Sequence, residues 1–225
     1  NRLIAAVQAR AEALWRAGPC HAYAESIGFA SWEGLWARYD WPSAEMRRMK
    51  AWAADYPLTA WTQGLADAGA DDAALAGDLL AVYRAERARR HTAFPESAPL
   101  LTALRPQFRL GLLTNGCPDV QHRKLDGSGL RGFFAAVVVT GEVGIGKPHP
   151  KPFEVILDRL AATKDAAVMV GNSLTSDIQG ARNAGVYSVW LDFDDARLAE
   201  PGPGGIRPDA RIGRLSELPG VFDGL

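Results

Sequence analysis

Cysteine is scarce in this 225-residue chain: it has only Cys20 and Cys117, which lie far apart. They supply neither a disulfide framework nor the cysteine set of a zinc site, and they favour a reducing, cytoplasmic location. Long apolar runs are missing too, since none approaches the roughly 20 residues of a membrane-spanning helix. Basic charge is not in excess, because 25 Lys and Arg residues stand against 26 Asp and Glu, for a net charge of −1. These absences predict a protein that binds neither membranes nor nucleic acid.

Apolar side chains are plentiful: hydrophobic residues make up 48% of the chain, enough for one large core or a core with a smaller domain. The sequence predicts a helical region over residues 1–92. Leu3, Val7 and Leu14 fall on one face of its first helix. This region holds six of the seven tryptophans, which either fill a small helical core or include one or two that line a substrate pocket. Further helices are expected around 20–27, 43–54, 58–68 and 72–91.

The pattern changes after Phe94, where short apolar runs alternate with helical stretches. Continuous runs rich in Val and Leu that alternate with helices indicate a parallel sheet covered on both faces. The sequence therefore predicts an α/β fold, with a doubly wound parallel sheet following the helical region. Strands are expected at 109–113, 135–141, 166–172, 187–192 and 210–215, helices at 97–104, 118–128, 152–162 and 174–184, and a Pro- and Gly-rich loop at 201–205.

A first polar segment, LLTNG (112–116), stands where a buried strand ends and a helix begins. Thr114 and Asn115 end the strand, and Gly116 allows the tight turn into the helix. A hydroxyl, an amide and free backbone N–H groups at a helix start suit an anion such as phosphate. A Thr-Asn-Gly turn is also ordinary loop chemistry, so the segment alone leaves both interpretations open.

A second segment, GKPHPKPFE (146–154), holds Lys147 between stiff neighbours. Pro148 biases the lysine toward extended geometry, and Pro150 and Pro152 stiffen the residues that follow. A lysine fixed in this way can bind phosphate as a point charge. The competing interpretation is a solvated lysine in a proline-rich connection.

A third segment, GNSLTSDIQGARNAG (171–185), has polar residues at a strand tip and inside the following helix. Asn172 and Ser173 are expected to cap that helix. Asp177 lies one turn further on, and its side chain tilts back toward the strand tip, so Asn172 and Asp177 can face one site. Such oxygen ligands suit magnesium, which keeps several waters and bonds one or two carboxylates. Alternatively, Asp177 merely interacts favourably with the helix dipole.

Together, the three segments resemble the motifs of the haloacid dehalogenase (HAD) superfamily of hydrolases, especially its phosphatases with a helical cap. LLTNG resembles the second motif, GKPHPKPFE the lysine-bearing third, and GNSLTSDIQGARNAG the acidic fourth. The spacing fits as well, with 32 residues from Asn115 to Lys147 and 25 from Lys147 to Asn172. The resemblance covers nearly the whole chain and implies a helical cap domain over 1–92 and a Rossmann-like α/β core over 93–225.

The resemblance also implies a mechanism. An aspartate attacks phosphorus, a second aspartate two residues later acts as acid and base, and the phosphoaspartyl intermediate is then hydrolysed. Magnesium and the lysine neutralise the transferring group. The expected function is a magnesium-dependent phosphatase acting on a small phosphorylated metabolite. The implied catalytic residues are Lys147 and Thr114, the phosphate-binding residues are Thr114, Asn115, Gly116 and Lys147, and the metal ligands are Asn172 and Asp177.

Two features depart from the family pattern. The first motif, a strand ending in Asp-x-Asp, is absent, although in the family this strand lies between those equivalent to 109–113 and 166–172. Two buried strands would lose their ladder partners without it, and unpaired buried backbone groups are costly. We therefore expect the natural protein to continue on the N-terminal side of Asn1 with this core strand. The other departure is Asn172, which replaces an acid of the fourth motif; its amide brings no charge and predicts weaker metal binding.

Two other functions fit the same residues. A 2-haloacid dehalogenase of this superfamily would displace halide from carbon without a metal. Asn172 favours it slightly, whereas the LLTNG and GNSLTSD segments favour a phosphatase. The other function is that of a catalytically inactive protein that binds a partner, and only the absent nucleophile favours it. Metal dependence would separate the first two functions, and the sequence does not indicate the oligomeric state.

Overall fold

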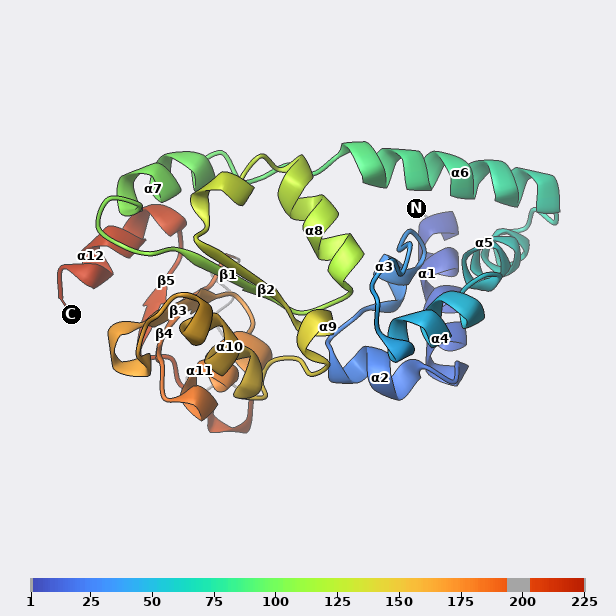
Figure 1. Ribbon diagram of the computed structural model, residues 1–225. Coiled ribbons are helices and arrows are strands. Elements are labelled where there is room, and N and C mark those ends of the chain that lie inside the picture. Colours follow the sequence, from blue (N-terminus) through green and yellow to red (C-terminus); the bar gives the residue numbers. More distant parts are fainter. Residues whose placement is uncertain (1, 194–202, 225) are drawn as a thin grey trace. The chain divides into compact units, whose positions relative to one another are not determined.

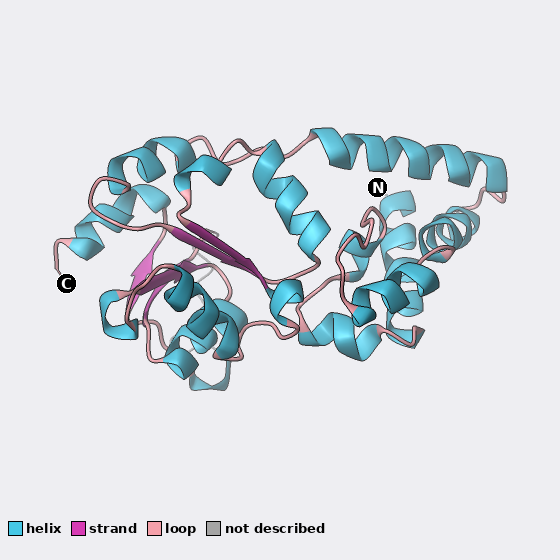
Figure 2. Cartoon of the chain, viewed as in Figure 1, coloured by secondary structure: helices cyan, strands magenta, loops and turns pink. Residues whose placement is uncertain are grey.

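The computed structural model describes residues 2–193 and 203–224, so positions 201 and 202 of the predicted loop lie outside the described residues. The chain divides into two compact units, each with its own secondary structure (Figure 1, Figure 2). The division of the chain into a cap over 1–92 and a core over 93–225 stays a prediction. The first unit comprises Asn1–Thr92, Asn115–Gly129 and Val139–Gly144, and the second comprises Ala93–Thr114, Leu130–Val138 and Ile145–Leu225.

The first unit is built of helices packed around an aromatic core. Helices α1 and α5 approach closely at Gly64, where an added Cβ would lie 2.6 Å from the Cα of Val7. The buried face of α1 is centred on Val7, Ala11 and Trp15, and the predicted face residues Leu3 and Leu14 are partly buried against the same core. The helices are α1 (Arg2–Ala17), α2 (His21–Ser26), α3 (Ser31–Gly34), α4 (Ala44–Trp52), α5 (Tyr56–Asp67), α6 (Ala73–Arg89), α8 (Pro118–Gly127) and α9 (Thr140–Val143).

The tryptophans of the helical region are mainly core residues. Trp15, Trp36 and Trp61 are buried in the first unit. The ring of Trp15 meets Phe29 edge-on, with 5.1 Å between the ring centroids, which is a favourable aromatic arrangement. Trp32 differs, since it is 43% exposed. For the three buried tryptophans, the structure therefore supports the core interpretation.

Most helices lie within a few residues of their predicted positions, but α3, α9 and α12 (Leu218–Phe222) had no predicted counterpart. These helices are too short to show a hydrophobic period in the sequence. Helix α9 replaces the end of the strand predicted over 135–141: the strand stops at Val139, and Gly144 ends α9 with a left-handed φ of 83°. No helix in the described part of the chain combines the length and hydrophobicity of a membrane span.

The second unit is an α/β structure whose strands have helices on both faces. Val168 and Val170 of one strand pack in the cluster that contains residues of α7 and α12. Met169, between them, packs instead in the cluster with residues of α10 and α11. Because alternate strand residues face opposite sides of a sheet, these contacts place helices on each face. The elements are α7 (Ser97–Leu104), β1 (Gly111–Thr114), β2 (Ala136–Val139), α10 (Lys151–Arg159), β3 (Val168–Gly171), α11 (Gln179–Ala184), β4 (Tyr187–Leu191), β5 (Ala210–Ile212) and α12.

The strands of the described residues form two sheets, and the interruption falls between β1 and β3, the two strands that were expected to lack a ladder partner without the first-motif strand. One sheet has the order β3-β4-β5 and is parallel, with Val170 opposite Val189 and Leu191 opposite Ile212. The other pairs β1 with β2. The α/β class with a parallel sheet is thus correct, and β1 and β3 do not pair with each other in the described residues.

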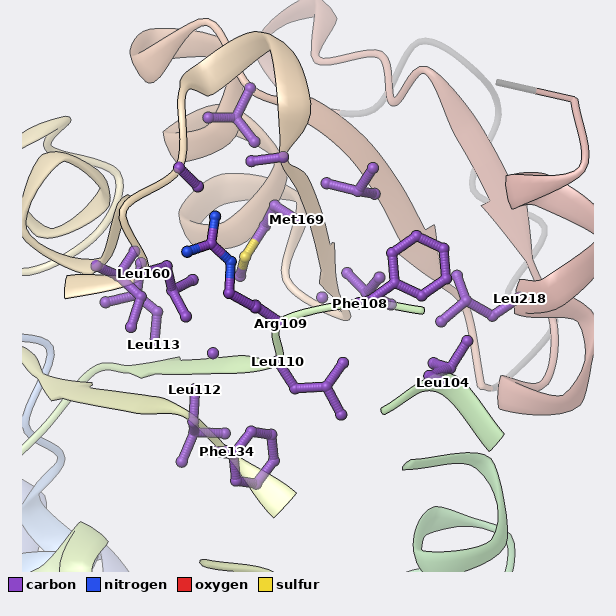
Figure 3. A pocket seen from close by; sticks show the side chains of 18 of the residues that line it. Leu104, Phe108, Arg109, Leu110, Leu112, Leu113, Phe134, Leu160, Met169 and Leu218 are labelled. Atoms are coloured by element: carbon purple, nitrogen blue, oxygen red, sulfur yellow. The ribbon is translucent and has the colours of Figure 1, made fainter. Parts of the chain in front are cut away.

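A cavity of about 870 Å³ lies within the second unit, between β1 and β3. Its lining from the β1 side includes Leu112 and Leu113, and its lining from the β3 side includes Val168, Met169 and Val170. Figure 3 shows Leu112, Leu113 and Met169 around this space. We call it the β1–β3 cleft. It is apolar and bordered by two strands that each have a single strand neighbour among the described residues.

Candidate active site

A buried ion pair joins the second and third sequence segments in the second unit. The Nζ atom of Lys147 lies 2.7 Å from Oδ1 of Asp177. The residues are 9% and 7% exposed, respectively. Burying two charges is costly unless they are paired and also hydrogen-bonded. Both side chains therefore need hydrogen-bond partners besides each other. The solvated-lysine interpretation of Lys147 is therefore wrong.

The first further partner ties Lys147 to the end of β1. Its Nζ donates a hydrogen bond to the carbonyl oxygen of Leu113 at 2.8 Å. Leu113 directly precedes Thr114, the last residue of β1. Lys147 itself precedes Pro148, with a cis peptide bond between them, and α10 begins soon after, with Pro152 in its first turn. The proline-rich segment thus places an ammonium group next to the end of β1.

The second further partner ties Asp177 to the end of β3. Oδ2 of Asp177 accepts a hydrogen bond from the backbone N–H of Ser173 at 3.0 Å. Ser173 caps the following π-helical turn, Leu174–Ile178, by accepting from the N–H of Ser176. A Cβ on Gly171 would lie 2.4 Å from Cβ of Asp177, so the glycine leaves room for the carboxylate over the strand tip. The prediction that Asp177 points back toward the strand is correct in its geometry.

Asn172 follows β3 directly and is exposed. Its backbone carbonyl accepts a hydrogen bond from Nε1 of Trp190 at 3.1 Å, which fixes the main chain at the strand tip. Its side chain therefore stands at the same strand end as the Lys147–Asp177 pair. The amide oxygen of Asn172 and the carboxylate of Asp177 are oxygen donors of the kind that magnesium prefers.

These donors fit magnesium in kind but do not form a complete site. Both carboxylate oxygens of Asp177 already accept hydrogen bonds, one from Lys147 and one from Ser173. Within residues 2–193 and 203–224, no group of three His, Cys, Asp or Glu side chains could hold a metal ion. Magnesium at this position would need further oxygen ligands, such as waters, phosphate oxygens or another carboxylate.

The first sequence segment is shared between the two units. Thr114 ends β1 in the second unit, and Asn115 and Gly116 belong to the first. The backbone N–H of Gly116 donates to the carbonyl oxygen of Ile27 at 2.9 Å and lies 3.0 Å from Oγ1 of Thr140. The sequence predicted free backbone N–H groups at this turn, but the N–H of Gly116 is engaged. The assignment of Thr114, Asn115 and Gly116 to phosphate binding stays a prediction.

Cys117, next to this turn, is not a candidate nucleophile. The residue is buried, and its Sγ lies 3.0 Å from Oδ1 of Asp119. Burial, with the adjacent Asp119 carboxylate, raises the pKa of the thiol far above its usual value. The raised pKa favours the protonated thiol. Because the thiolate is the reactive form, Cys117 acts as a core residue and not as a nucleophile.

A family model described as haloacid dehalogenase-like hydrolase matches residues 3–185. The chain belongs to this family of hydrolases. Phosphoserine phosphatase from Thermus thermophilus is 41% identical to it over 95% of this chain and 83% of that protein.

Two solved structures show the same relationship across nearly the whole chain. The putative HAD-hydrolase YfnB from Bacillus subtilis, bound to magnesium, has a TM-score of 0.60 and 25% identity, covering 98% of this chain and 92% of that one. The 2-haloacid dehalogenase from Pseudomonas syringae has a TM-score of 0.55 and 31% identity, covering 97% and 91%. The predicted family membership is confirmed.

Three residues that contact the polar sequence segments were not singled out from the sequence: Gly28 lies against Asn115, Thr140 against Gly116, and Trp190 against Asn172. Trp190 lies in an apolar strand and gives no local sign that its indole N–H fixes Asn172. Thr140 looked like part of a strand, yet its buried hydroxyl donates to the carbonyl oxygen of Ile27, 113 residues away. Only the folded chain brings such pairs together.

Proposed function

We propose that this hydrolase is a magnesium-dependent phosphatase that hydrolyses a small phosphorylated metabolite through a phosphoaspartyl intermediate. The observation that carries the proposal is the buried Lys147–Asp177 pair, anchored to the ends of both β1 and β3. A fixed ammonium group beside two strand ends suits the charge of a transferring phosphoryl group. The similarity to phosphoserine phosphatase over most of both chains supports the same reaction class.

The β1–β3 cleft supports a position for the nucleophile. We propose that an extended apolar segment of the natural protein fills this cleft and pairs with both β1 and β3. The Nζ atom of Lys147 donates to the carbonyl oxygen of Leu113, next to the end of β1, and pairs with Asp177. Asp177 in turn accepts a hydrogen bond from the N–H of Ser173, just after the end of β3. A strand parallel to both neighbours would therefore end beside Lys147. A carboxylate at that end could attack phosphorus, and the lysine would hold it in position.

The natural gene tests this part of the proposal directly. We expect the residues immediately before Asn1 to form a short apolar strand that ends in Asp-x-Asp, because the cleft needs apolar side chains and the site needs carboxylates. Sequencing the native open reading frame decides the question. A start codon at or just before Asn1, in a protein that folds alone, would contradict the prediction and favour the binding-protein function.

The remaining residues take roles consistent with their positions. In this proposal, Thr114 binds phosphoryl oxygens with its hydroxyl and Asn115 binds them with its amide. Gly116, whose N–H is engaged by Ile27 and Thr140, shapes the turn and does not donate to the phosphoryl group. Asn172 and Asp177 hold magnesium together with the carboxylates of the added strand. Magnesium, when bound, would reduce the negative charge that the attacking carboxylate meets. The helices of residues 1–92 act as a cap, and the free thiols Cys20 and Cys117 agree with a cytoplasmic location.

A 2-haloacid dehalogenase is the second candidate, favoured by the uncharged Asn172 and by the similarity to the Pseudomonas syringae enzyme. The two functions differ in their need for metal. Full-length protein should release inorganic phosphate from phosphoserine or another small phosphate ester when magnesium is present, and lose this activity with EDTA. Halide release from a 2-haloacid that EDTA does not affect would instead establish the dehalogenase.

Asn172 provides a sharper test of the metal side of the site. Asn172→Asp should lower the magnesium concentration for half-maximal activity severalfold, because an exposed strand-tip carboxylate adds one negative charge to the metal's ligands. Magnesium titration of phosphatase activity measures the change. Thr175→Asp is the matched control, since Thr175 is also exposed and lies only three residues away. Equal shifts in both variants, or none in either, would show that Asn172 does not contact the metal.

A further inference from the structure

The turn after β1 is clamped from two sides within the first unit. On one side, the carbonyl oxygen of Ile27 accepts hydrogen bonds from the N–H of Gly116 at 2.9 Å and from Oγ1 of Thr140 at 2.7 Å. Oγ1 of Thr140 also lies 3.0 Å from the Gly116 nitrogen, in position to accept its N–H. Three polar groups from distant parts of the sequence thus bond to one another, and Thr140 is fully buried.

The other side of the turn is held by the residue after Thr140. The N–H of Gly141 donates to the carbonyl oxygen of Gly116 at 3.1 Å. A Cβ on Gly141 would lie 2.6 Å from Cδ of Pro118, so only glycine allows this approach. The peptide groups on both sides of Gly116 are therefore bonded, which fixes the backbone of the turn. Gly116 has a φ of 125°, a conformation that favours glycine.

This clamp also determines what lies against Asn115. Gly28 has a φ of 67°, and a Cβ added to it would lie 2.5 Å from Nδ2 and 2.8 Å from Cβ of Asn115. The main chain of Gly28 thus packs directly on the Asn115 side chain. Ile27 precedes Gly28, and its carbonyl oxygen accepts hydrogen bonds from Gly116 and Thr140. These hydrogen bonds therefore hold the main chain of Gly28 against Asn115. Displacement of residues 27 and 28 would leave the Asn115 amide without this support.

We propose that Thr140 is a positioning residue, which acts through Ile27 and Gly28 to hold the Asn115 amide in its phosphate-binding orientation. This inference rests on the proposed phosphatase function, in which Asn115 contacts the phosphoryl oxygens. Asn115 would bind the phosphoryl group before and during the reaction, so its misplacement weakens binding more than turnover. Thr140 therefore affects KM for phosphate esters more than kcat.

The test compares Thr140→Val with Thr140→Ser in the full-length protein. Valine keeps the shape of the buried threonine but removes the hydroxyl, whereas serine keeps the hydroxyl. For Thr140→Val we expect KM for phosphoserine, and the inhibition constant of inorganic phosphate, to rise by about threefold to tenfold, as loss of a hydrogen bond predicts. The kcat value should change less than either constant, and Thr140→Ser should restore both constants to near wild type.

Amide hydrogen exchange gives a readout that does not depend on turnover. The Gly116 N–H should exchange faster in Thr140→Val than in wild type or Thr140→Ser, because it loses one of its two acceptors. Faster exchange with weaker phosphate binding supports the proposal. A lower melting temperature with unchanged KM and unchanged phosphate inhibition would show that Thr140 is only structural and would overturn it. Wild-type protein that hydrolyses no phosphate ester would instead contradict the proposed function, and phosphate binding would still decide the role of Thr140.

Discussion

Replacing Lys147 with alanine should lower kcat/KM for phosphate-ester hydrolysis by about a hundredfold or more, the typical effect of losing a preorganised electrostatic group. The ammonium group is fixed before substrate arrives, because it donates to Leu113 and pairs with Asp177. Such a group stabilises developing charge without the cost of reorienting during the reaction. Steady-state kinetics of the full-length protein with phosphoserine measures the loss.

The matched control for this substitution is Lys151→Ala. Lys151 lies in the same proline-rich segment but is exposed, and its ion pair with Glu154 is on the surface. Exposed pairs of this kind contribute little, so the control should keep wild-type activity and stability. Circular dichroism should show that both variants are folded. Wild-type turnover in a folded Lys147→Ala variant would remove the lysine from the catalytic machinery.

Local sequence patterns were sufficient to predict most of the elements that carry the site. The runs around β3 and β4 are rich in Val and Leu, which marked them as buried strands, and Gly185 marked the end of α11, with a φ of 71°. The position of Asp177 one turn inside its helix predicted its direction, because a helical side chain tilts toward the N-terminus. These predictions succeed because residues close together in the sequence determine local backbone and side-chain geometry.

Contacts between distant segments could not be predicted in the same way. Proline spacing showed that Lys147 is held stiffly, but its bond to Leu113 depends on how two strands and a loop pack. The engagement of the Gly116 N–H by Ile27 depends on a carbonyl group from a loop that carries no motif. The gap between β1 and β3 is a different case: the family resemblance predicted it, whereas the local residue pattern of the two strands gave no sign of the cleft that lies between them.

The buried pair also makes Asp177→Asn the substitution with the largest expected effect on stability. The change leaves the Lys147 ammonium group buried without its anion, and breaking a buried pair in this way typically costs about 3–5 kcal/mol. The amide can still accept a hydrogen bond, but it brings no charge. Urea denaturation should show the loss in the free energy of unfolding, measured without magnesium so that metal binding does not contribute.

Asp165→Asn is the control, because Asp165 is exposed and its substitution should change stability by no more than about 0.5 kcal/mol. The double variant Lys147→Met with Asp177→Leu separates the two roles of the pair. It should recover most of the stability, since apolar residues of similar volume can replace a buried ion pair, but it should remain inactive. A double variant as unstable as Asp177→Asn would mean that the pair is needed for the geometry of the strand ends. An Asp177→Asn protein with wild-type stability would contradict the buried pair itself, because a buried ammonium group that loses the charge of its carboxylate partner cannot remain buried without cost.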